Sequence, residues 1–192
     1  MAVAGERKLQ ILQTLAGMLE TPTGEKITTA ALAARLDVSE AALYRHFASK
    51  AQMFEGLIEF IEQSLFGLIN KITTSQEAGL GQTEAIVSVL LGFAQKNPGM
   101  TRVLIGEALV NENERLQARI NQLHDRLEAT LRQCLRFASG QDETQQSLNA
   151  SAAANMLLCY VVGRWHQFSK SGFKRDPLAD FALQWSLLRG AF

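Results

Sequence analysis

The sequence predicts an all-α protein, because apolar residues recur at helical spacing along most of its 192 residues and no stretch alternates as a half-buried strand does. Only three prolines interrupt this periodicity, and 47% of the residues are hydrophobic, which is enough for a substantial core. About nine helices are expected. A chain of this length can hold one domain, or a small headpiece joined to a larger helical body.

The first expected helix covers residues 6–20. One apolar face runs along it, formed by Leu9, Leu12, Leu15, Ala16 and Leu19. The turn residues Thr21-Pro22-Thr23-Gly24 end it. This helix is expected to close the core of the headpiece.

Residues 27–47 carry the most informative pattern, two short helices joined by a tight turn. Thr28 precedes a run of good helix formers and can cap a free amide. Asp37 stands where the chain must turn sharply, and Asp tolerates a left-handed backbone better than most residues. Ser39 is expected to cap the second helix, residues 40–46.

The apolar spacing predicts how these two helices pack. The residues expected to meet in one small core are Leu32, Leu36, Val38, Leu43 and Phe47. The outer face of the second helix is then small, with Tyr44 and Arg45 near its end, and it fits a major groove roughly 12 Å wide. Residues 28–47 are therefore predicted to form a helix-turn-helix, with residues 40–46 as the recognition helix. The alternative is an ordinary αα-hairpin with a solvated polar face.

The run VSEAALYRHFASKAQMF, residues 38–54, resembles the signature of the TetR-type regulators. Asp37 departs from the pattern, since many members have Gly there. The resemblance implies a TetR-like fold with a three-helix DNA-binding domain over residues 5–65 and a C-terminal dimerisation and partner-binding domain over residues 66–192. Helix 49–72 would be shared between them. Residues 39–65, 90–109 and 115–136 more specifically resemble the branch of that family that acts in nucleoid occlusion.

The resemblance also implies which residues contact double-stranded DNA. Those expected to face base edges are Glu40, Ala41, Ala42, Tyr44 and Arg45, and those expected to hold phosphates are Thr28, Ser39, His46 and Lys50. Residues 1–50 hold six basic and five acidic side chains, a net charge of +1. DNA affinity must therefore come from the placement of charge, and it should fall with salt.

Ser49 is expected to cap a fourth helix that runs to about residue 72. Its buried stripe consists of Phe54, Leu57, Ile58, Ile61, Leu65, Leu68 and Ile72. Phe60 and Phe66 lie off this stripe, so each either packs on another element or is offered to a partner. A loop over residues 73–81 follows.

Residues 82–96 are apolar nearly all round, which predicts a central helix. One face carries Ala85, Val89, Gly92 and Lys96, a small-residue notch with a positive end. Such a face suits either a docking groove for a partner peptide or a close helix crossing at Gly92.

The resemblance implies that the partner is the division GTPase FtsZ. The groove that binds FtsZ would lie between the fourth and fifth helices of this chain. The residues expected to form it are Phe60, Val89, Gly92, Lys96 and Asn97. Leu68 stands where the closest relatives are expected to have Arg, so one polar contact of this groove is expected to be missing.

The rest of the chain predicts helices over residues 101–110, 111–138 and 148–170, and a last helix that starts at Asp176-Pro177. The charged face of residues 111–138 reads as solvated. The last two helices carry more apolar surface than one small body can hide, which predicts a homodimer joined through a four-helix bundle. The residues expected at this interface are Met156, Tyr160, Trp165, Phe168, Phe181 and Trp185. Two recognition helices would then lie ~34 Å apart and read a pseudo-palindromic site.

The sequence gives no indication of catalysis, so we do not expect an enzyme. The three histidines, His46, His124 and His166, fall on separate helices, and no metal or cofactor is expected. Cys134 and Cys159 are expected to be buried in a reduced compartment. No signal peptide is evident, and the most apolar stretch is shorter than the ~20 residues that span a membrane. The expected location is the cytoplasm, on the nucleoid.

Two other functions stay open. One is a repressor that senses a small molecule in a closed apolar cavity of the body, for which the candidate lining residues are Met100, Met156, Trp165 and Phe168. The other is a helical scaffold that binds no DNA, which leaves the Tyr44-Arg45-His46 sequence unexplained. A small-molecule effector is not expected.

Overall fold

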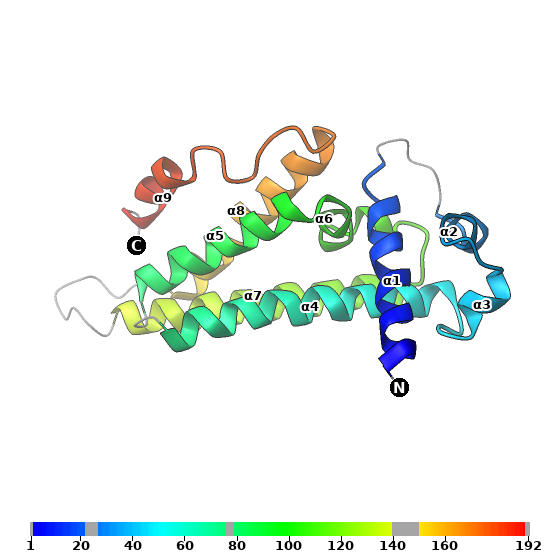
Figure 1. Cartoon of the computed structure of the whole chain (residues 1–192). Coiled ribbons are helices and arrows are strands. Elements are labelled where there is room, and N and C mark those ends of the chain that lie inside the picture. The colour runs from blue at the N-terminus through cyan, green and yellow to red at the C-terminus, as the bar shows by residue number, and fades with distance from the viewer. Residues whose placement is uncertain (1, 22–26, 76–78, 140–149, 191–192) are drawn as a thin grey trace. The chain divides into compact units, whose positions relative to one another are not determined.

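The computed structural model describes residues 2–21, 27–75, 79–139 and 150–190 (Figure 1). Over these ranges the chain forms nine α-helices and one short 3-10 helix, without a strand, so the all-α prediction is confirmed. The chain divides into two compact units, residues 1–61 with 97–120 and residues 62–96 with 121–192. Helices α4 (Lys50–Ser75) and α7 (Glu114–Ser139) each contribute residues to both units. The predicted turn at residues 22–24 and the predicted start of a helix at residue 148 lie outside the described residues.

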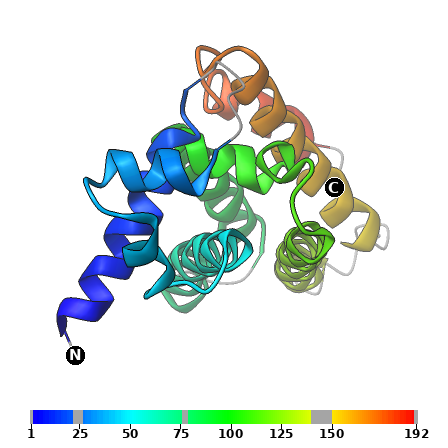
Figure 2. The ribbon, with the colours of Figure 1, turned by 90° about the vertical axis from the view of Figure 1, so that its right-hand side faces the viewer.

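The first unit is built around three helices that precede α4. The helices that lie wholly in this unit are α1 (Ala2–Met18), α2 (Thr29–Arg35), α3 (Glu40–Tyr44), α6 (Pro98–Leu104) and the 3-10 helix η1 (Glu107–Leu109). Helix α1 packs against α2, and α2 packs against α3 (Figure 2). The core between them is made of side chains that are almost fully buried: Ile11, Leu15, Leu32, Leu43, Met53 and Phe54.

The predicted caps and turn of this unit are present. The Thr28 hydroxyl accepts a hydrogen bond from the Ala31 amide at 3.1 Å, and Ser39 accepts one from Ala42 at 3.3 Å. Asp37 adopts the left-handed conformation with φ 54°. These local interactions define the ends of α2 and α3 and the sharp turn between them.

Three details of the first unit differ from the prediction. Leu9 is exposed and Ile11 is buried, whereas the other four residues of the predicted face, Leu12, Leu15, Ala16 and Leu19, are buried as expected. Helix α1 also begins earlier than predicted, at Ala2. Leu36 and Val38 are only half-buried.

The segment expected to form one helix over residues 101–110 instead starts at Pro98 and breaks at Gly106, whose φ is 76°. Gly99 on α6 lies against α1 so closely that a Cβ there would come within 1.9 Å of the Ala16 carbonyl oxygen.

The second unit is centred on α5 (Leu80–Lys96), which packs on α8 (Ala150–Lys170) and α9 (Phe181–Arg189) (Figure 1). The indole Nε1 of Trp165 on α8 donates to the Leu90 carbonyl at 3.0 Å. On the neighbouring α7, the Cys134 thiol donates to Gln82 at 2.9 Å, and burial raises the pKa of that thiol. Helix α5 is therefore central, as predicted.

Helix α4 differs from its predicted stripe within this unit. Leu68 is 40% exposed and Ile69 is buried in its place. Phe66 is buried, and the Arg126 guanidinium lies 3.6 Å from the centre of its ring, so Phe66 packs on another helix rather than facing a partner. The helix also continues to Ser75, into the stretch predicted to be a loop.

Two further predictions for the second unit are wrong. Cys159, expected to be buried, is exposed. Asp176-Pro177 does not begin the last helix: residues 177–180 form a turn, in which the Asp176 carboxylate accepts a hydrogen bond from the Leu178 amide at 2.9 Å. Helix α9 starts at Phe181, after Asp180 with φ 58°. No helix in the described ranges is both long and apolar enough to cross a membrane.

Candidate nucleic-acid interface and partner surfaces

Helix α3 presents its side chains to solvent and is anchored by one residue. Leu43 is buried, whereas Ala41, Tyr44 and Arg45 are exposed, Tyr44 by 45%. Ala42 and His46 are half-buried. The predicted DNA-facing surface is thus open in the first unit, with a phenol and a guanidinium at the end of a narrow helix.

Glu40 has a structural partner that its sequence position did not indicate. Its Oε2 accepts a hydrogen bond from the Thr29 hydroxyl of α2 at 2.6 Å. This bond joins the first turns of the two helix-turn-helix helices. Because residues 29 and 40 are separated by the turn, only the turn geometry brings them together.

Lys50, expected to hold a phosphate, forms a part-buried ion pair with Glu112 and lies 5.6 Å from the Phe54 ring. A second link joins the same segments: Arg115 pairs with Glu55 at 2.7 Å. The start of α7 was expected to be a merely solvated charged face. It is instead attached to the first turns of α4, within the first unit.

Arg102 of α6 makes a further set of polar contacts in this unit. Its guanidinium donates to the Leu19 carbonyl at 3.0 Å and pairs with Glu107 at 3.1 Å. Beside it lies a cavity of about 360 Å³. The lining side chains include Met18, Ile27, Arg35, Phe54, Arg102 and Glu112. None of the four lining residues predicted for an effector cavity borders this one.

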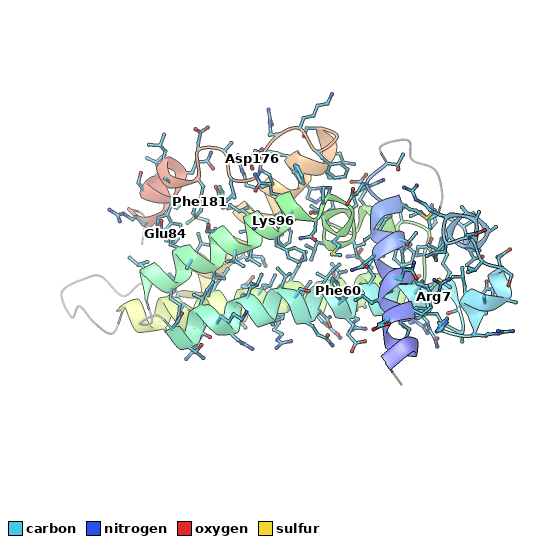
Figure 3. The ribbon with its side chains drawn as sticks, in the orientation of Figure 1. Arg7, Phe60, Glu84, Lys96, Asp176 and Phe181 are labelled. Atoms are coloured by element: carbon cyan, nitrogen blue, oxygen red, sulfur yellow. The ribbon has the colours of Figure 1, made fainter. Side chains whose placement is uncertain are left out.

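The face of α5 predicted to dock a partner lies at the surface of the second unit. Ala85, Val89 and Gly92 are half-buried, and Lys96, which is labelled in Figure 3, is exposed. A Cβ added at Gly92 would meet Leu178 at 3.8 Å, which is ordinary van der Waals contact. The position therefore has room for a Cβ, so no close helix crossing requires glycine at residue 92. In the first unit, Phe60 and Asn97 are both half-buried.

Three of the six residues predicted for the dimer interface are buried in the single chain. Trp165, Phe168 and Trp185 are buried within the single chain, where they pack the core of the second unit. Side chains with so little exposed area offer almost no surface to a second copy. Met156 is exposed, and Tyr160 and Phe181 are half-buried.

Two leucines that the sequence reading missed are the most exposed apolar side chains of α9. Leu183 is 69% exposed and Leu187 is 77% exposed. They are spaced i, i+4 and so share a face of α9, away from the stripe that contains Trp185. The i, i+4 spacing of the two leucines is the sequence signal that could have identified this exposed face. Near them, the Tyr160 hydroxyl donates to Gln184 at 2.6 Å; burial raises the pKa of this phenol, and the charge of Arg164 offsets part of the rise.

In the described residues, no group of three or more His, Cys, Asp or Glu side chains is placed to hold a metal ion.

The chain matches two family descriptions. Residues 25–57 match "Bacterial regulatory proteins, tetR family", and residues 77–191 match the SlmA-like "Tetracyclin repressor-like, C-terminal domain". It is 52% identical over 186 residues to the "Nucleoid occlusion factor SlmA" of Alteromonas mediterranea, covering 97% of this chain and 95% of that one. It is 48% identical to the protein of the same name from Idiomarina loihiensis, covering 95% and 93%.

Solved structures show the same fold at low sequence identity. The fatty acid degradation regulator FadR of Bacillus halodurans superposes with a TM-score of 0.79 at 14% identity, covering 95% of this chain and 94% of that one. The TetR family regulator PfmR of Thermus thermophilus superposes with a TM-score of 0.75 at 21% identity, covering 93% and 96%. At these identities the likeness supports the fold alone.

Proposed function

Because the chain belongs to the TetR family of helix-turn-helix regulators, and within it to the SlmA nucleoid occlusion factors, we propose that it marks chromosomal DNA against cell division. As a homodimer bound to specific sites on the nucleoid, it binds FtsZ and prevents Z-ring assembly there. It acts by binding and carries out no catalysis. The observation that carries this proposal is the full-length likeness to SlmA together with the exposed outer face of α3.

In the proposed DNA complex, α3 enters the major groove. Tyr44 and Arg45 read base edges, and Ala41 and Ala42 allow close approach because they are small. The phosphate contacts come from Thr28, Ser39 and His46, whose side chains flank the two short helices.

Glu40 and Lys50 differ from the other predicted DNA-binding residues, because each already has a partner within the first unit. We assign Glu40 the role of holding α2 and α3 together. Lys50 reaches a phosphate only if that phosphate replaces Glu112 in its ion pair.

The proposed dimer uses exposed and half-buried apolar side chains of α8 and α9. They are Met156, Tyr160, Phe181, Leu183 and Leu187. Leaving such a patch in water is unfavourable, and packing two copies of it together buries it. The pair of recognition helices then meets two half-sites about one DNA turn, ~34 Å, apart.

We propose that FtsZ contacts Val89, Gly92 and Lys96 of the second unit and, separately, Phe60 and Asn97 of the first unit. What supports the α5 part is its surface position and the small side chains that let a partner approach the backbone. We keep Phe60 in the set because it is only half-buried.

The proposal is tested by mixing the purified protein with FtsZ and GTP, with and without a palindromic chromosomal fragment, and following polymer assembly by light scattering and sedimentation. We expect the DNA-bound protein to suppress assembly more strongly than the free protein. Unchanged FtsZ assembly at saturating DNA-bound protein would contradict the proposed function.

Phe60→Ala is the matching variant. It should leave DNA binding unchanged and weaken FtsZ binding. Equal FtsZ affinity for the variant and the parent protein would remove Phe60 from the contact while leaving the rest of the proposal in place.

A ligand-responsive repressor is the second candidate, and the cavity in the first unit is the observation in its favour. That cavity is lined by four charged side chains, Arg35, Arg102, Glu107 and Glu112, so it is not the closed apolar cavity expected of such a sensor. The division-factor proposal therefore takes precedence.

A further inference from the structure

A basic segment between α8 and α9 lies beside the proposed partner face of α5. The amide of Gln95 donates to the Asp176 carboxylate at 2.9 Å, which brings residues 174–178 next to the last turn of α5. Further along the face, Leu178 is the nearest side chain to a Cβ built at Gly92. Figure 3 labels Lys96 and Asp176 at this junction. All of these residues belong to the second unit.

The segment is held in one conformation by its own hydrogen bonds. The Ser171 hydroxyl oxygen accepts from the amides of Lys174 and Arg175 at 3.1 and 2.8 Å. The Arg164 guanidinium donates to the carbonyls of Asp176, Pro177 and Ala179 at 2.9–3.0 Å. Because one guanidinium satisfies three carbonyls, the loop is preorganised and loses little entropy when it binds a partner.

The charges on this surface are unbalanced. Lys96, Lys174 and Arg175 are exposed, and no ion pair is found for any of them within the part of the chain that the structure describes. The one acidic side chain among them, Asp176, already accepts hydrogen bonds from Gln95 and Leu178. A fixed loop with free cations next to a small-residue face can pair with carboxylates.

We propose that Lys96, Lys174 and Arg175 form the charged end of the partner face and bind an acidic segment of FtsZ whose apolar residues lie along Val89 and Gly92. This inference rests on the proposed function and adds the loop residues Lys174 and Arg175 to the contact.

The size of the cluster favours a peptide over other anionic partners. Binding to duplex DNA commonly involves about 6–10 phosphate contacts, and binding to anionic lipid commonly uses clusters of about 4–8 basic residues. Three cations beside half-buried Ala85 and Val89 match neither. They match a short peptide that offers carboxylates at one end and apolar side chains along the rest.

The test is a charge reversal, Lys174→Glu with Arg175→Glu, in the full-length protein. The control is Lys71→Glu with Arg136→Glu, which changes the net charge equally at exposed positions on α4 and α7 of the same unit. Binding of fluorescently labelled FtsZ is measured by anisotropy at low and high salt. Duplex DNA and vesicles of anionic phospholipid are titrated in parallel, and circular dichroism verifies that both variants fold.

We expect the loop variant to bind FtsZ about tenfold more weakly at low salt, with a smaller difference at high salt because the charges are then screened. The control should stay within about twofold of the parent protein. DNA and vesicle binding should respond equally to both variants.

Other outcomes distinguish a failure of the proposed function from a failure of the loop assignment. If the parent protein does not bind FtsZ, the proposed function fails and this inference falls with it. If the parent binds FtsZ and the loop variant equals the control, only the loop assignment is overturned. A loss confined to DNA or to vesicles would overturn it in favour of that partner.

Discussion

Helix α3 has five residues and buries one of them, whereas helix α8 has 21 residues and buries nine. The first is held by its cap at Ser39, the bond from Thr29 to Glu40 and the single anchor Leu43. The second is held by packing on α5 and by the Trp165 indole. A helix that buries little leaves its surface free for DNA, while a helix that buries much offers a partner only the residues left over.

The largest expected effect is therefore on α8. Trp165→Ala should lower the free energy of unfolding by ~3–5 kcal/mol, because it removes a fully buried aromatic ring and leaves the Leu90 carbonyl without its donor. Denaturant unfolding followed by circular dichroism measures this loss.

Leu187→Ala is the matched control on α9. Since Leu187 is exposed in the single chain, its removal should leave the stability of the monomer within about 0.5 kcal/mol and weaken dimerisation instead, as seen by analytical ultracentrifugation. The reverse result, in which Trp165→Ala changes only dimerisation, would place Trp165 at the dimer interface and contradict its role in the core.

On α3 the effect should appear in binding and not in folding. Arg45→Ala should weaken binding to the specific DNA site by ~1–3 kcal/mol if the guanidinium makes a bidentate base contact. The free energy of unfolding should be unchanged, because Arg45 is exposed. Titration of a labelled duplex against a scrambled one separates these effects, and an equal loss on both duplexes would assign Arg45 to phosphates.

Removing the N-cap of α3 should have a smaller effect, in which a loss of stability also weakens DNA binding. Ser39→Ala removes the acceptor of the Ala42 amide and should cost about 1 kcal/mol of stability. Thr14→Ala on α1 is a suitable control, since the Thr14 hydroxyl bonds only a carbonyl of its own helix. If the two variants unfold at the same denaturant concentration, packing rather than capping fixes the start of α3.

This contrast also explains which parts of the protein the sequence could predict. The helix-turn-helix is encoded by neighbours in the chain: Thr28 and Ser39 cap the amides three residues on, and Asp37 supplies the turn. Such signals need no knowledge of the tertiary structure. The all-helical class and the central position of α5 follow equally from local periodicity.

The errors lie where the answer depends on distant contacts. Trp165 and Phe168 looked available for dimerisation because α8 is apolar on several faces, and only the packing of α5 decides which face is covered. Lys50 was expected to bind a phosphate, because nothing in the sequence indicates that the fold brings Glu112 beside it. Arg164 gave no sequence signal, because its three acceptors are backbone carbonyls of a loop.

Asp37, in the turn between α2 and α3, is the site of the smallest expected effect. Its φ of 54° is a conformation that costs most L-residues roughly 1–2 kcal/mol, and Asp is one of the few non-Gly residues that adopt it readily. Asp37→Gly removes the remaining strain but loses more backbone entropy on folding, by about 0.5–1 kcal/mol. The two terms nearly cancel, so we expect a change in stability below about 0.5 kcal/mol, whereas Asp37→Ala should be clearly destabilised. Since α3 depends on this turn for its direction, DNA affinity should follow stability across the three proteins. A variant that keeps its stability and loses DNA binding would show that the Asp37 carboxylate has a role in DNA binding beyond the turn.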